Sequence, residues 1–116
     1  MENNLELKNQ EFTYLGKGSK ITGDFHLKGM AYLAAELEGK IFMQANSTLT
    51  IERSGSFNGH IECEHIEIFG LFKGTLNARG KVIVHPSAKV DGRINARDLI
   101  IYPGADVNMD AQTNDH

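Results

Sequence analysis

Residues 37–43, Leu37-Glu38-Gly39-Lys40-Ile41-Phe42-Met43, set the pattern of this chain: apolar residues stand two positions before a glycine and two and four positions after it. The same arrangement surrounds Gly23, Gly59, Gly74 and Gly92, at successive spacings of 16, 20, 15 and 18 residues. Five glycines with three positions each give fifteen tests, and all fifteen positions are apolar against a background of 41%. The apolar positions are Ile21, Phe25, Leu27, Leu37, Ile41, Met43, Phe57, Ile61, Cys63, Phe72, Leu76, Ala78, Val90, Ile94 and Ala96.

A second, shorter apolar pair follows each glycine and also alternates with polar residues, which is typical of strands with one buried face. Turn-forming residues, such as 53–56 and 85–87, separate these pairs from the next glycine. Each unit is therefore predicted to consist of three short strands joined by two corners. Residues 31–38 also suit a short helix, and the sequence leaves that alternative open. The pairs are Ala31/Leu33, Leu49/Ile51, Ile66/Ile68, Val82/Val84 and Leu99/Ile101.

The unit length of 15 to 20 residues is too short for a helix pair or a propeller blade and fits one coil of a β-helix. Stacked coils lie about 4.8 Å apart, so equivalent residues form columns. We expect an all-β, single-domain, three-sided parallel β-helix with about six coils. Right-handed coiling is our working expectation, because the spacing itself does not determine the handedness. It should span residues 11–110, between a flexible N-terminal tail (1–10) and a C-terminal tail (111–116). The repeated glycine marks either a bend or a residue with positive φ.

Composition narrows the possible functions. The chain has 116 residues and a net charge of −3, so it has no basic surplus for nucleic-acid binding. One cysteine excludes an intramolecular disulfide and a multi-cysteine zinc site. No apolar run approaches the roughly 18 residues of a membrane span, and the N-terminus lacks the features of a secretion signal. We therefore expect a cytoplasmic location.

Residues 60–65 contain the side chains most suggestive of metal binding, namely two histidines, two glutamates and Cys63. Strand alternation places Cys63 inside while His60 and Glu62 point outward, and ligands on opposite faces cannot converge on one ion. Residues 16–20 lack the spacing of a phosphate-binding loop. The sequence thus predicts no catalytic, cofactor-binding or metal site, and no enzyme.

The two ends of the expected stack carry apolar strands, with about ten residues before the first and few after the last. Neither tail has the pattern of an amphipathic helix that could cover an end. Uncovered β-strands with apolar side chains should pair with another copy, so we expect end-to-end self-association. The residues predicted to form this polymer interface are Phe12, Tyr14, Ile101, Val107 and Met109.

The repeated units Gly39-Lys40-Ile41-Phe42-Met43 and Gly92-Arg93-Ile94-Asn95-Ala96, together with segments 81–88 and 99–105, make the chain similar to bactofilins over residues 12–110. The resemblance implies a right-handed β-helix that polymerises without nucleotide into non-polar filaments. It also implies a cytoskeletal role in cell shape or envelope growth, with cell-wall enzymes such as peptidoglycan peptidases as partners. Many members touch the membrane through an N-terminal peptide. Here only Leu5 and Leu7 could insert, so we expect membrane contact to be absent or indirect.

Two other functions remain open. The first is a non-polymerising adaptor that binds a partner through its outward face. The second is a small β-helix acyltransferase or carbonic-anhydrase-like trimer, which requires a strict six-residue period and histidines that meet across subunits.

Overall fold

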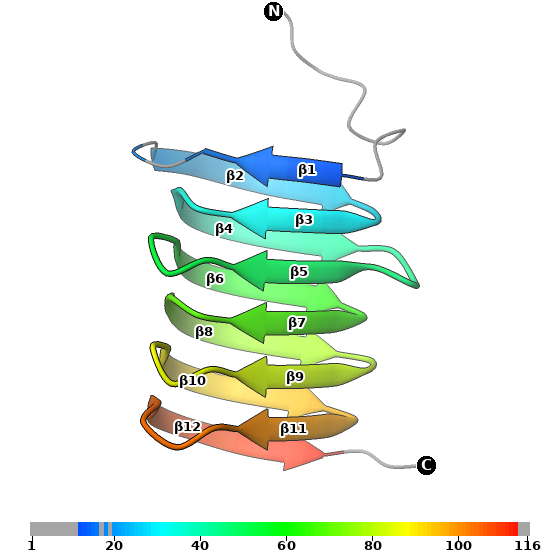
Figure 1. The fold of residues 1–116 in the computed structure, drawn as a ribbon. Helices are drawn as coiled ribbons and strands as arrows, with labels where there is room; N and C mark the ends of the chain where they lie inside the picture. Colours follow the sequence, from blue (N-terminus) through cyan, green and yellow to red (C-terminus); the bar gives the residue numbers. More distant parts are fainter. Residues whose placement is uncertain (1–11, 17, 19, 114–116) are drawn as a thin grey trace, which may run out of the picture.

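The computed structural model describes residues 12–16, 18 and 20–113, and that part of the chain consists of β-strands without helices. Strands of four and eight residues alternate along the chain (Figure 1). The short strands are β1 (Phe12–Leu15), β3 (Met30–Leu33), β5 (Thr48–Ile51), β7 (His65–Ile68), β9 (Lys81–Val84) and β11 (Asp98–Ile101). The long strands are β2 (Lys20–Leu27), β4 (Glu36–Met43), β6 (Ser56–Cys63), β8 (Leu71–Ala78), β10 (Lys89–Ala96) and β12 (Asp106–Thr113).

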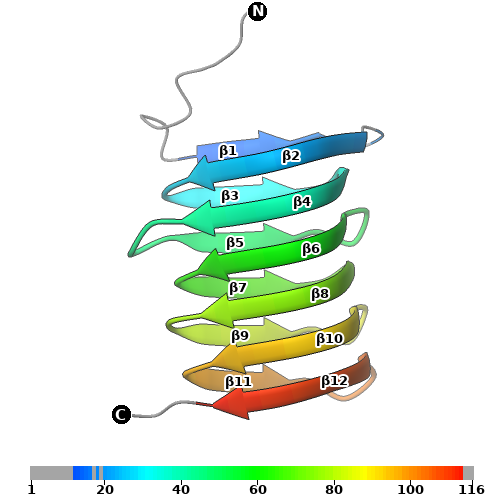
Figure 2. The same cartoon turned by 180° about the vertical axis from the view of Figure 1, so that it is seen from behind.

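The short strands form one parallel six-stranded sheet and the long strands form another, which lies behind it (Figures 1 and 2). One short and one long strand make each turn, so the chain is a β-solenoid of six turns. The predictions of an all-β fold, of parallel stacked coils and of their number are confirmed. The three-sided cross-section and the right-handed coiling stay predictions. The last strand continues to Thr113, past the boundary expected at residue 110.

The strand register matches the columns predicted from the sequence. Gly39 pairs with Gly23 on one side and with Gly59 on the other, and the series continues through Gly74 to Gly92. The apolar residues around each glycine fall into columns that fill the interior, where Ile41, Ile61 and Ile94 have no exposed surface. In one column the rings of Phe57 and Phe72 stack, with centroids 5.7 Å apart. Parallel in-register strands place like side chains one above another, which is why a period in the sequence becomes a packed core.

Residues 31–38 are not helical. They lie in β3, the turn after it and the first residues of β4. Ala31 and Leu33 face the interior, as do Leu49 and Ile51 of the next turn, with which they pair. Packing against the neighbouring turns outweighs the modest helix propensity of the alanines.

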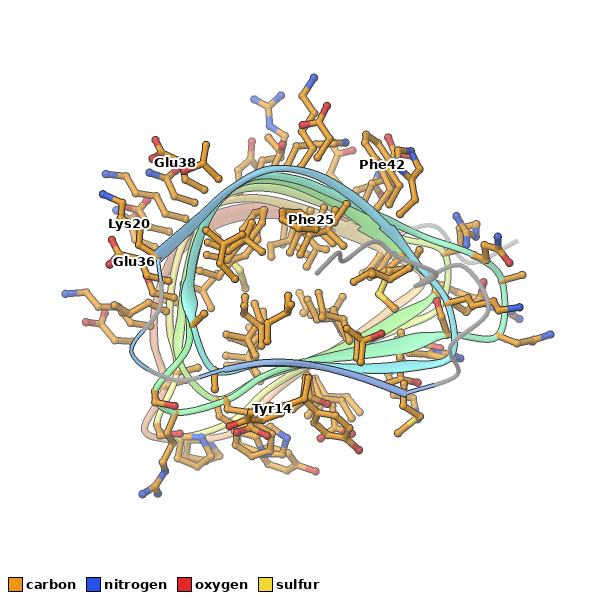
Figure 3. The ribbon with its side chains drawn as sticks, turned by 90° about the horizontal axis from the view of Figure 1, so that it is seen from above. Tyr14, Lys20, Phe25, Glu36, Glu38 and Phe42 are labelled. Atoms are coloured by element: carbon orange, nitrogen blue, oxygen red, sulfur yellow. The ribbon has the colours of Figure 1, made fainter. Side chains whose placement is uncertain are left out.

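The glycine column has an unusual backbone. The five glycines have φ between 132° and 145° and sit in the middle of the long strands, which curve around the core (Figure 3). A side chain at Gly39, Gly59, Gly74 or Gly92 would overlap the backbone carbonyl oxygen of the glycine one turn before it. The repeated glycine is therefore required by positive φ and also by the close approach of successive turns.

Asn46 is the only non-glycine residue with positive φ among the described residues (φ 62°), and it lies in the turn between β4 and β5. Asparagine tolerates this left-handed conformation better than alanine does. We expect Asn46→Ala to lower the free energy of unfolding by about 1 kcal/mol and Asn46→Gly to change it by less than about half of that. Urea denaturation of the three proteins measures this difference. Equal stability of the alanine and glycine variants would contradict the assignment of strain to this turn.

Candidate assembly interface at the ends of the stack

Four strands lie at the edges of the two sheets. β1 and β2 form the N-terminal end of the stack, and β11 and β12 form the C-terminal end (Figures 1 and 2). Within the part of the chain that the structure describes, each of these strands has a hydrogen-bonded neighbour on one side alone. Each end therefore presents two rows of backbone N–H and C=O groups that can accept a further strand.

The interior columns continue to the C-terminal end and are open there. Ile101 pairs with Val84, and Val107 pairs with Val90. Val84 is 0% exposed and Val90 is 1% exposed, whereas Ile101 is 41% and Val107 is 37% exposed. The difference arises because the described strands end with the sixth turn, so none of them covers it. A further turn placed there would remove these apolar side chains from water, which is favourable.

Met109 stands where the glycine column would continue, opposite Gly92. Its backbone does not adopt the positive φ of the five glycines, and its half-buried side chain packs against the core. The C-terminal turn thus differs from the other five turns, and the two ends of the solenoid are chemically distinct.

At the N-terminal end, too, no further turn of described residues lies over the first one, although the side chains there are better buried. Seen from above, Phe25 projects into the ring of the first turn and Tyr14 projects away from it (Figure 3). Leu15, Ile21 and Phe25 are half-buried and pack against the core. Thr13 is buried at 5% exposure, and its hydroxyl has no hydrogen-bond partner.

The residues predicted for the polymer interface occupy different positions. Ile101 and Val107 are exposed members of the interior columns at the C-terminal end, and Met109 lies beside them. Tyr14, which is 52% exposed, lies on the outer face of its sheet. Phe12 belongs to the edge strand β1, while its side chain lies outside the described part. Leu15, Ile21 and Phe25 were not among the predicted interface residues, although the repeated sequence pattern includes Ile21 and Phe25.

The flanks of the solenoid carry polar and aromatic pairs between successive turns. His60 hydrogen-bonds Thr75 (2.7 Å) and Glu62 (3.0 Å) on the outer face. His85 stacks on Phe69 with ring centroids 3.9 Å apart, and its Nε2 lies 3.0 Å from a carboxylate oxygen of Glu67. These contacts join residues of the same strand or of adjacent turns. Among the described residues, no group of three or more histidine, cysteine, aspartate or glutamate side chains is arranged to hold a metal ion.

Cys63 faces the core with 0% exposure, as strand alternation predicts, and burial raises the pKa of its thiol to about 12. The unfolded thiol ionises near pH 9.0, so above that pH the unfolded chain loses a proton that the folded chain keeps. This thiol therefore makes no difference to stability below pH 9.0 and lowers it between 9.0 and about 12. We expect the free energy of unfolding to fall by roughly 1.4 kcal/mol per pH unit in that window, in addition to any fall that the Cys63→Ala variant shows. Urea denaturation of both proteins at several pH values measures the slopes, and equal slopes would contradict this effect.

In the described residues there is no helix long and apolar enough to span a membrane. The fold and its ends define a class of protein: a short parallel β-solenoid in which no other described strand covers the sheet edges and apolar columns of the first and last turns.

The chain belongs to the bactofilin family, since the family model, described as polymer-forming cytoskeletal, matches residues 13–112. The matched region begins in β1 and ends in β12, so it includes both ends of the stack. Comparisons with curated proteins and with solved structures give no significant match.

Proposed function

We propose that this bactofilin assembles end to end, without nucleotide, into cytoskeletal filaments. The observation that carries the proposal is the exposure of Ile101 and Val107 at the end of columns whose members are fully buried in the second to fifth turns. Two ends in contact continue both the columns and the hydrogen-bonded sheets. Because each subunit has two open ends, contact at both produces a filament rather than a closed dimer.

The energy of this assembly comes from the contact itself. Full burial of a valine or isoleucine side chain contributes about 1.5–3 kcal/mol, and paired edge strands add backbone hydrogen bonds. No step in this process needs the hydrolysis of a nucleotide. Non-polar filaments, which the family resemblance implies, require each kind of end to pair with its own kind through a two-fold axis.

The proposed role of the filament is a cytoplasmic scaffold for cell shape or cell-envelope functions. Cell-wall enzymes such as peptidoglycan peptidases are the proposed partners, and any membrane contact is proposed to be indirect. The support for this role is membership of a polymer-forming cytoskeletal family.

Pelleting by ultracentrifugation, followed by negative-stain microscopy of the pellet, tests the assembly. Purified protein at micromolar concentration, without nucleotide, should pellet and show filaments. A protein that stays monomeric at all concentrations would contradict the proposal and favour the adaptor alternative. Compact trimers that bind zinc or acetyl-coenzyme A would favour the enzyme alternative.

A further inference from the structure

One column of outward side chains has an unusual order of charges. It consists of the first residue of each long strand, and we call it the edge column: Lys20, Glu36, Ser56, Leu71, Lys89 and Asp106. Lys20 and Glu36 point outward from the edge where the long strands begin (Figure 3). The ion pairs between described residues do not include its four charged members.

The edge column is complementary to itself when it is reversed. From the first turn to the last it reads positive, negative, serine, leucine, positive, negative. A two-fold axis between the third and fourth turns places Lys20 opposite Asp106 of a second copy, and Glu36 opposite Lys89 of that copy. The axis repeats both contacts, which gives four pairs of opposite charge. A parallel, in-register partner would instead place every charge opposite its like.

The centre of the edge column provides an apolar contact. Leu71 is 47% exposed, and the same operation sets it against Ser56 of the second copy. Ser56 and Leu71 both line a shallow groove of about 360 Å³ on this flank. The small serine leaves room there for a leucine side chain, and Ser56 and Leu71 are one turn apart, so the two leucines also meet near the axis.

Other columns of the same face do not share this property. A second outward column consists of the residue that directly follows each central glycine position. There the same axis sets Asp24 opposite Asp110 and Lys40 opposite Arg93. In the column two residues after the edge column, Glu38 would face Asp91. Like charges in these positions repel, so the complementary contact is confined to the edge column.

We propose that two solenoids pair side by side in antiparallel orientation through their edge columns. The contact uses the flank and leaves both ends free, so it is compatible with end-to-end assembly and does not depend on it. A contact made by one column over six turns has a small area, and exposed ion pairs are individually weak, so two isolated subunits should pair weakly. Where end-to-end contacts align the edge columns of successive subunits, the same contact would recur along the length, and each additional subunit would strengthen the pairing of two filaments.

Disulfide crosslinking tests the orientation. Two variants, Glu36→Cys and Lys89→Cys, are each combined with Val107→Arg to suppress end contacts, and one carries a tag so that mixed products differ in mass. The buried Cys63 thiol is protected in both. Equimolar mixing and oxidation should yield the mixed 36–89 dimer, in which the remaining Glu36 and Lys89 still face each other. Products that join like positions, or no product, would overturn the proposal.

End-to-end contacts cannot imitate this result. Positions 36 and 89 lie in the second and fifth turns. Head-to-tail stacking would separate them by three turns, or about 14 Å, and the pairing of like ends would separate them by six turns, or about 29 Å. A disulfide requires Cα atoms within about 7 Å. A matched control uses Lys40→Cys and Arg93→Cys, which occupy the same two turns in the repulsive column. The control pair should crosslink poorly, and crosslinking equal to that of the 36–89 pair would overturn the assignment to the edge column.

Charge reversal gives an independent measurement by analytical ultracentrifugation in the Val107→Arg background. Glu36→Lys or Lys89→Glu alone creates like charges at two contacts, and we expect the pair to dissociate about tenfold more readily. The double variant restores opposite charges and should recover the pairing. Single variants that pair normally, or a double variant as weak as either single one, would overturn the proposal. Filaments formed by the wild-type protein despite such a result would leave end-to-end assembly intact.

Discussion

Gly59→Ala should prevent this protein from folding. A Cβ at position 59 would overlap the carbonyl oxygen of Gly39 and lie 2.9 Å from its carbonyl carbon. The residue also has φ of 144°, which side chains rarely adopt. Relief requires the turns to separate, which would break the sheet on both sides. We expect the free energy of unfolding to fall by several kcal/mol, which is comparable with the total of about 5–15 kcal/mol for a small domain.

Two other glycines separate the causes. Gly23 has φ of 145°, but a Cβ there meets nothing closer than 3.8 Å, so Gly23→Ala introduces backbone strain without a clash. Gly16 has no atom within 4 Å of a Cβ and is not among the positive-φ residues. Circular dichroism and thermal unfolding should rank stability as wild type and Gly16→Ala, then Gly23→Ala, then Gly59→Ala. A Gly59→Ala protein that unfolds at the same temperature as Gly16→Ala would disprove the proposed role of the glycine column.

Val107→Arg should abolish filaments while leaving the subunit folded. The side chain at position 107 is 37% exposed in the isolated solenoid, so an arginine can turn toward water there. In an end-to-end contact the same guanidinium would be buried without a partner, which costs several kcal/mol. Because each 1.4 kcal/mol weakens association tenfold, we expect the concentration needed for assembly to rise at least about a hundredfold.

The control for this variant is Thr50→Arg. Thr50 lies on the outer face of β5 in the third turn, between Tyr32 and Glu67 of the adjacent turns, and far from either end. It adds the same charge without entering the proposed contact. Both variants should show the wild-type circular dichroism spectrum, and Thr50→Arg should still pellet. If Val107→Arg forms filaments at the same protein concentration as the wild type, Val107 is not part of the interface.

The core could be predicted from the sequence because stacking turns one-dimensional periodicity into contacts. Once Gly39 and Gly59 are aligned, the positions of Phe57, Ile61 and Cys63 in the interior follow from alternation alone. The sequence could not decide the conformation of the glycines. Positive φ and the approach of the preceding carbonyl depend on how successive turns nest, and residue identity does not specify that distance.

The ends were harder to predict because each terminal turn lacks part of the repeat. In β1 the aromatic residues suggested that Phe12 and Tyr14 would mark the apolar face. The register instead pairs Thr13 with Ala31 and Leu15 with Leu33, so the less conspicuous residues occupy the interior columns. Hydrophobicity is a weak guide in a four-residue strand, and pairing with the next strand fixes which face is buried.

The last turn shows the same limitation. Met109 replaces the glycine. The repeat could not predict where its side chain would lie, because the five equivalent residues have no side chain. The structure places it opposite Gly92 with its side chain against the core. The edge column was missed for another reason: its complementarity becomes visible once the residues are assigned to successive turns.

The solenoid should continue from one subunit into the next along the filament. Electron cryomicroscopy of filaments from the purified protein would show whether it does. We expect strands perpendicular to the filament axis, with a repeat of about 4.8 Å along that axis that continues across subunit boundaries. Each subunit should add six turns, or about 29 Å, to the length. A strand repeat that runs across the filament, or subunits joined through their flanks with both ends open to solvent, would contradict it.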